Sequence, residues 1–128
     1  MKIKKYNKIK WIEIYDRIYK KNFHLCYGGE AKDFVEFLVN YHGKDILKEL
    51  RLLNSVKGAK LTVDGYHYVW ISKCREPEAV MVHELLHFVI DSLDDCQIPL
   101  TKKTSDTHCY YMEYLYEEIM SVFKKLTK

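Results

Sequence analysis

Proline and glycine are scarce in this sequence, which has two and five of them among 128 residues. Because it also lacks repeats and low-complexity tracts, collagen-like and Pro/Gly-rich disordered chains are excluded. No apolar run approaches the about 20 residues that a membrane-spanning helix needs, so we expect no membrane partner. The segment after the first lysines is broken by charges and lacks a cleavage site of the secretory type. We therefore expect a cytoplasmic location.

The four cysteines, Cys26, Cys74, Cys96 and Cys109, are widely spaced and form no CxxC pair. This spacing indicates neither a zinc knuckle nor a redox motif, and we expect reduced thiols. Cys109 is predicted to be a small buried residue, with zinc ligation as the alternative because thiolate binds zinc well.

Hydrophobic residues make up 48% of the chain and aromatic residues 14%, enough for one core. We therefore expect a single domain over residues 1–128. The net charge is +3, and lysines gather near both ends of the chain. Since no nucleic-acid-binding motif accompanies them, we interpret these lysines as favouring solubility and do not expect a nucleic-acid partner.

The first two thirds of the chain alternate between strand and helix patterns, which predicts an α+β fold. The Asp64-Gly65 dipeptide is the strongest turn signal, because it supplies the positive φ angles of a tight hairpin. The predicted elements are strands 12–15 and 23–27, a helix 30–41 ended by Gly43, a short helix 44–53, and hairpin strands 60–63 and 66–72.

An HExxH motif, His83-Glu84-Leu85-Leu86-His87, lies inside an apolar segment with helical periodicity. Pro77 and the acids beside it mark the start of this helix. Residues four apart lie one above the other on a helix, so both imidazoles leave the same face and can hold one metal ion. The two histidines share a stripe with Val80 and Ile90, and we expect that stripe to face inward.

The motif is a zinc-hydrolase signature. Zinc held by two histidines and a third protein ligand keeps one position for water and lowers its pKa towards about 7. A neighbouring carboxylate, here Glu84, then accepts the proton. The alternative is a pair of core histidines with hydrogen bonds to the backbone, but this requires several partners for the buried polar groups.

The third ligand is expected on the next helix, predicted over 105–119. Asp91 is excluded, because eight residues of helix place it about 12 Å along the axis from His83. Periodicity favours His108, which lies one turn before the apolar stripe of that helix, whereas Asp106 falls outside the stripe. Glu113 and Glu117 are conceivable ligands but fit the solvated face of an amphipathic helix better.

From about Tyr15 to Ile119 the chain resembles the small zincin-type metallopeptidases encoded by tailed bacteriophages. These proteins place a strand before a V-H-E-x-x-H helix, then a loop, then a helix that opens Asp-Glu before an aromatic-rich run. The matching pieces here are 68–71, 82–87, 98–99 and 106–115. The resemblance implies a zincin-like fold, with a small mixed sheet, an HExxH helix and a C-terminal helix, and a location in the host cytoplasm.

The resemblance also bears on the third ligand. Asp106 keeps the acid that opens the last helix, while Thr107 stands where those proteins carry the ligand glutamate. Threonine is a poor zinc ligand. The candidate metal ligands are therefore His83 and His87 with either Asp106 or His108.

The predicted function is that of a zinc-dependent hydrolase, a metallopeptidase in the first instance, that cleaves a peptide or protein substrate with Glu84 as proton acceptor. Strand 66–72 is a candidate edge for peptide binding, although an ordinary sheet strand explains it equally well. Candidate oxyanion donors are Tyr66, Tyr68, Tyr110 and Tyr111. Thr107 motivates the alternative, a catalytically inactive zincin-like protein that acts as a protein-binding module.

Overall fold

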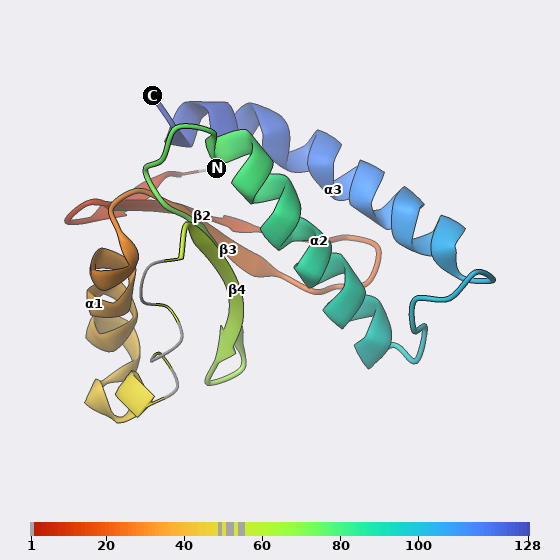
Figure 1. The fold of residues 1–128 in the computed structure, drawn as a ribbon, viewed down its shortest axis with the longest axis horizontal. Coiled ribbons are helices and arrows are strands. Elements are labelled where there is room, and N and C mark those ends of the chain that lie inside the picture. The colour runs from red at the N-terminus through yellow and green to blue at the C-terminus, as the bar shows by residue number, and fades with distance from the viewer. Residues whose placement is uncertain (1, 49, 51–52, 54–55) are drawn as a thin grey trace.

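The computed structural model describes residues 2–48, 50, 53 and 56–128 of the chain. It is a mixed α+β structure built on one five-stranded sheet with helices on both faces (Figure 1). The strands are β1 (Lys4–Tyr6), β2 (Ile9–Ile14), β3 (Phe23–Tyr27), β4 (Gly58–Val63) and β5 (Tyr66–Ile71). The helices are α1 (Ala31–His42), the 3-10 helix η1 (Lys44–Lys48), α2 (Pro77–Asp95) and α3 (Ser105–Leu126).

The strand order in the sheet is β1-β2-β3-β5-β4. The β3–β5 pair is parallel, and the other neighbouring strands are antiparallel. The parallel pair needs a crossover, and the chain makes it through α1, η1 and β4. As a result β4 and β1 are the two edge strands, while β5 lies inside the sheet. The prediction that strand 66–72 is an edge is therefore wrong, and its alternative, an ordinary sheet strand, is confirmed.

The hairpin of β4 and β5 is confirmed at the expected turn, where Asp64 and Gly65 have φ angles of 50° and 81°. Helix α1 begins and ends within one residue of its predicted bounds, and Gly43, with φ 88°, ends it as expected. The predicted helix 44–53 is a 3-10 helix up to Lys48, and residues 49 and 51–52 of that prediction lie outside the described residues.

Two hydrophobic cores lie on opposite faces of the sheet. One contains Phe23, Leu85, Phe88 and Leu115, and packs α2 and α3 against the sheet. The other contains Trp11, Phe34 and Trp70, and packs α1 against the opposite face. Phe34 and Trp70 stack at 4.8 Å between ring centroids. The strands β2, β3 and β5 thus alternate their side chains between two buried faces, as a sheet covered on both sides requires.

None of the helices in the described residues is both long and apolar enough to cross a membrane. All four cysteines are free thiols in the structure. Cys109 lies exposed on α3, so the expectation that it is a buried core residue is wrong.

Candidate metal centre

The HExxH motif lies in the middle of α2, but its histidines do not face the core. The side of α2 that packs on the sheet carries Met81, Leu85 and Phe88, all fully buried. At 100° per residue His83 and His87 fall on another side, and the side chain of His83 is 69% exposed. The expectation that the two histidines face inward is therefore wrong. That expectation rested on the stripe that the histidines share with Val80 and Ile90. These two residues are themselves only partly buried, at the margin of the packed face.

His83 and His87 do lie together, as their spacing predicts. The centroids of the two rings are 4.9 Å apart with an interplanar angle of 72°. Two neighbouring imidazoles that are open to solvent can bind one metal ion as a pair.

Glu84 lies between this histidine pair and the sheet. The residue is 8% exposed, and its Oε1 is 3.9 Å from Nε2 of His83. Burial raises the pKa of the Glu84 carboxyl, while the charges of His83 and His87 and a hydrogen bond from the backbone of Lys60 act in the opposite direction. A carboxylate next to the histidines and screened from water suits a proton acceptor.

Strand β4 approaches α2 closely at this point because Gly58 has no side chain. A Cβ added to Gly58 would lie 2.5 Å from Cγ1 of Val80 and 3.1 Å from Cγ of Glu84. The backbone of Lys60, which acts to lower the pKa of the Glu84 carboxyl, belongs to the same approach. The outer edge of the sheet and the HExxH helix therefore form one continuous surface, with Glu84 where they meet.

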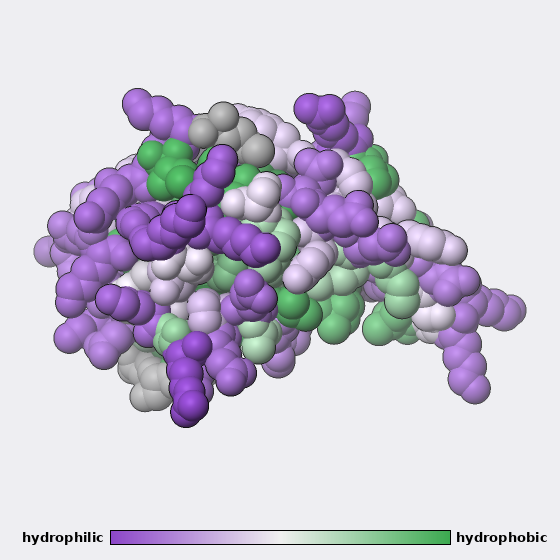
Figure 2. All heavy atoms as spheres, turned by 90° about the horizontal axis from the view of Figure 1, so that it is seen from above, coloured by the Kyte–Doolittle hydropathy of each residue, from purple (hydrophilic) through white to green (hydrophobic). Residues whose placement is uncertain are grey.

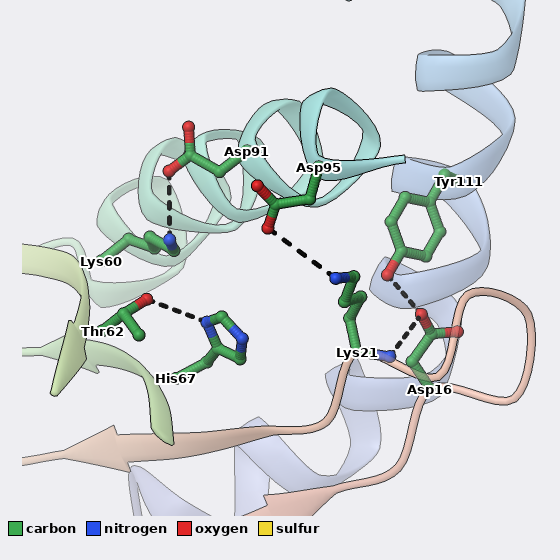
Figure 3. A network of polar contacts seen from close by, with 8 residues as sticks. All are labelled: Asp16, Lys21, Lys60, Thr62, His67, Asp91, Asp95 and Tyr111. Atoms are coloured by element: carbon green, nitrogen blue, oxygen red, sulfur yellow. Dashed lines mark hydrogen bonds and ion pairs between the residues drawn. The ribbon is translucent and has the colours of Figure 1, made fainter. Parts of the chain in front are cut away.

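Further along α2, ion pairs hold the helix to the sheet and its loops (Figure 3). Nζ of Lys60 on β4 lies 3.1 Å from Oδ2 of Asp91, and Nζ of Lys21 lies 3.7 Å from Oδ2 of Asp95. Asp91 is thus paired with a lysine, one helical turn beyond His87.

The two candidates for the third ligand lie in the first turn of α3. Asp106 is exposed, and His108 is 3% exposed, as the periodicity predicts. His108 uses Nδ1 to donate a hydrogen bond to the carbonyl oxygen of Thr104 at 3.0 Å. Its Nε2 is buried and has no hydrogen-bond partner among the described residues. Nδ1 therefore carries a proton, and in the neutral tautomer with this bond Nε2 is the nitrogen with the lone pair.

A complete metal centre is not assembled in the part of the chain that the structure describes. No group of three His, Cys, Asp or Glu residues there is arranged to hold a metal ion. Neither Asp106 nor His108 joins His83 and His87 in such a group. Glu113 and Glu117 are exposed, as expected for a solvated face. His83 and His87 thus supply two ligands for one zinc ion, whereas a catalytic zinc site requires a third protein ligand.

Comparison of the chain with known protein families, curated proteins and solved structures found no match. On the surface formed by α2 and β4, the side chains of His83, Glu84 and His87 are the groups that could carry out a reaction.

The candidate oxyanion donors are mostly engaged elsewhere. The Tyr68 hydroxyl lies on the α1 face of the sheet, 2.6 Å from Nε2 of His42, whose Nδ1 is 3.1 Å from Asp64. Tyr66 shares that face, because alternate residues of a strand point the same way. The Tyr111 hydroxyl is buried and donates to Asp16. Tyr66 and Tyr110 are the exposed members of the set, at 56% and 70%.

Sequence reasoning missed Gly58 and Lys60, the β4 residues beside Glu84. Gly58 lies just before the predicted strand 60–63, and an isolated glycine next to a strand can signal close backbone approach. What it approaches is determined by strand order, which the sequence does not encode in any local pattern.

Proposed function

We propose that the chain is a zinc-dependent hydrolase of the zincin-like type, and that its reaction is cleavage of a peptide bond. The observation that carries this proposal is the position of Glu84, buried between an adjacent pair of exposed histidines and the edge of the sheet. Core histidines explain this arrangement poorly, since both rings lie in solvent.

His83 and His87 would hold the zinc ion. When bound, zinc would supply the Lewis acidity that lets water attack an amide carbonyl near neutral pH. Glu84 would accept the proton of the attacking water and return it to the leaving amine. Its burial beside the histidines keeps the carboxylate within reach of that water and away from bulk solvent.

The substrate class proposed is an extended peptide, bound along β4. Among the described residues no strand pairs with the outer edge of β4. In the antiparallel pair of β4 and β5, every second residue of β4 directs its backbone N–H and C=O groups to β5. Lys57, just before β4, shows this alternation, because its carbonyl oxygen accepts a hydrogen bond from the N–H of Ser72 at 2.8 Å. The alternation leaves the backbone groups of Gly58 and Thr62 directed outward, where a peptide can add as a further strand.

The third ligand in this proposal is Asp106 or His108, and either one requires the first turn of α3 to move towards α2. Asp106 is exposed and can reorient. Nε2 of His108 has no hydrogen-bond partner among the described residues, and the neutral imidazole can bind zinc through this nitrogen. Separate alanine variants of the two residues distinguish them by zinc content.

The second candidate function is a zincin-like protein-binding module without catalysis. It is favoured by the lack of a third ligand in the described ranges and by Thr107 at the position where the phage metallopeptidases that the sequence resembles carry glutamate. Exposed Val82 and Leu86 beside the histidines would then contribute an apolar contact to a protein partner.

Hydrolysis of casein and of a quenched-fluorescent peptide mixture by zinc-loaded protein tests the proposal. Glu84→Gln should abolish cleavage and leave zinc content and circular dichroism unchanged, because the amide cannot accept the proton. Glu118→Gln, on the exposed side of α3, is the matched control and should cleave at the wild-type rate. Equal cleavage by Glu84→Gln and wild type would reject Glu84 as the proton acceptor, and no cleavage by zinc-loaded wild type would favour the binding module.

A further inference from the structure

Six lysines from both ends and the middle of the chain surround one hollow at the end of the sheet. The hollow has a volume of about 640 Å³ and lies between the β1–β2 turn, the start of α1 and the end of α3. Both chain ends lie on this side of the molecule, and hydrophilic side chains cover most of the face that Figure 2 presents. The lysines are Lys5, Lys8, Lys10, Lys32, Lys73 and Lys128.

Backbone contacts hold the walls of this hollow together. Gly28, with φ 122°, lies so close to the β1–β2 turn that an added Cβ would be 2.1 Å from the carbonyl oxygen of Lys8. Its N–H donates to Ile71 at 3.0 Å, and the N–H of Lys73 donates to Gly29 at 3.0 Å. Nζ of Lys10 donates to the backbone carbonyl oxygen of Lys128 at 3.0 Å. The fold therefore brings these lysines together at fixed positions.

A second hollow of about 590 Å³ continues the first one. It shares Gly29, Glu30, Lys32 and Lys73 with it and adds Lys57. We call the lining of the two hollows the lysine surface. It contains seven lysines and two acidic residues, Glu30 and Asp33, a net charge of +5. The whole chain has a net charge of +3, so all other side chains together sum to −2. Positive charge is thus concentrated on this surface.

The two acids belong to the start of α1. Asp33 accepts a hydrogen bond from the backbone N–H of Glu30 at 2.8 Å, and the two residues form a capping box. Glu30 also pairs with Lys32 at 3.7 Å, and in the described ranges this is the one ion pair that involves a lysine of the surface. Most of its lysines are therefore available to an external anion.

We propose that the lysine surface binds nucleic acid through the phosphodiester backbone. Two adjoining hollows form a track that suits an extended chain of phosphates, and lysine ammonium groups bind phosphates as point charges without reading sequence. A lipid bilayer fits less well, because it is flat and the first hollow is concave with no exposed large apolar residue in its lining. This inference replaces the expectation that the terminal lysines serve solubility alone.

Fluorescence anisotropy with a labelled 20-nucleotide oligothymidine and a labelled 20-base-pair duplex tests the proposal. The full chain should bind, and the logarithm of the association constant should fall linearly with the logarithm of salt concentration, by about 0.7 per phosphate for the single strand. Lys8→Glu/Lys73→Glu should weaken binding by about tenfold or more, because two attractive charges become repulsive. The affinity of Lys8→Gln/Lys73→Gln for the oligonucleotides should lie between those of this variant and the wild type.

Lys102→Glu/Lys103→Glu is the matched control, because it makes the same change in net charge in the exposed loop before α3. It should bind within about twofold of the wild type at 0.15 M salt, where charges beyond about 8 Å are screened. An equal loss of affinity in the two double glutamate variants would show that only net charge matters and would overturn the proposal. No binding to either oligonucleotide, or binding to phosphatidylserine vesicles alone, would overturn it too.

Discussion

The hydroxyl of Tyr111 on α3 donates a hydrogen bond to the carboxylate of Asp16, 95 positions earlier in the chain (Figure 3). Asp16 is buried in the connection between β2 and β3 and also accepts from the backbone N–H groups of Ile18 at 2.8 Å and Tyr19 at 3.2 Å. This contact ties α3 at Tyr111, three residues after His108, to the connection between β2 and β3.

Tyr111→Phe should therefore destabilise the fold, because it removes one donor from a buried carboxylate. We expect a loss of about 1–3 kcal/mol in the free energy of unfolding. Urea denaturation followed by circular dichroism measures it. Tyr110→Phe removes the neighbouring hydroxyl, which is exposed, and should change stability by less than about 0.5 kcal/mol. Equal stability of the two variants would show that the Asp16 contact contributes nothing.

The close approach of β4 to α2 makes a second prediction. Gly58→Ala should destabilise the fold by about 1–3 kcal/mol, because the new Cβ would lie 2.5 Å from Cγ1 of Val80 and 2.9 Å from the carbonyl oxygen of Trp70. The displaced β4 should also reduce peptide cleavage by moving away from Glu84.

Val80→Ala supplies the control for this prediction, since it deletes the nearest clashing atom. The double variant Gly58→Ala/Val80→Ala should lose less stability than the two single variants added together. If the stability losses of the two single variants simply add, the Cβ at position 58 and the side chain of Val80 do not clash.

Stability should also decrease on mild acidification. Burial lowers the pKa of His24 below its ordinary value, with Lys4 and His42 adding to the effect and Glu13 opposing it. Burial, Lys60 and Lys21 likewise lower the pKa of His67, against Asp95 and Asp91. A histidine with a lowered pKa takes up its proton more readily in the unfolded chain. The free energy of unfolding should thus be highest above about pH 6.5 and fall as the pH drops below that value.

His24→Phe tests the cause, because phenylalanine keeps the stacking on Tyr68, at 5.0 Å between centroids, and cannot be protonated. Urea denaturation at pH 7.5, 6.5 and 5.5 should give a smaller decrease for this variant than for the wild type. The same decrease in both proteins would assign the pH dependence to other groups.

Much of the fold follows from local patterns in the sequence. The Asp64-Gly65 turn, the glycine that ends α1 and the periodicity of α2 and α3 depend on neighbouring residues. These elements begin where they are expected, although α3 continues to Leu126, beyond the predicted end at residue 119. Strand β1 was missed because its lysine-rich sequence has no apolar alternation. The position of β5 in the interior of the sheet was not predicted, because strand order depends on contacts between distant segments.

The site was predicted in part. The HExxH spacing correctly places His83 and His87 side by side, since this depends only on helix geometry. Their outward orientation was missed, because a helix with apolar residues on most sides does not define which side meets the sheet. The lysine surface was missed for a similar reason: Lys8, Lys73 and Lys128 are distant in sequence, and only the fold brings them to one hollow.

The central claim is that His83 and His87 bind zinc, and elemental analysis of the purified protein tests it most directly. We predict about one zinc per chain, lost in His83→Ala and in His87→Ala and retained in His67→Ala, which changes a histidine bonded to Thr62 on the hairpin. A protein without zinc even after reconstitution, or equal zinc in all three variants, would contradict the account.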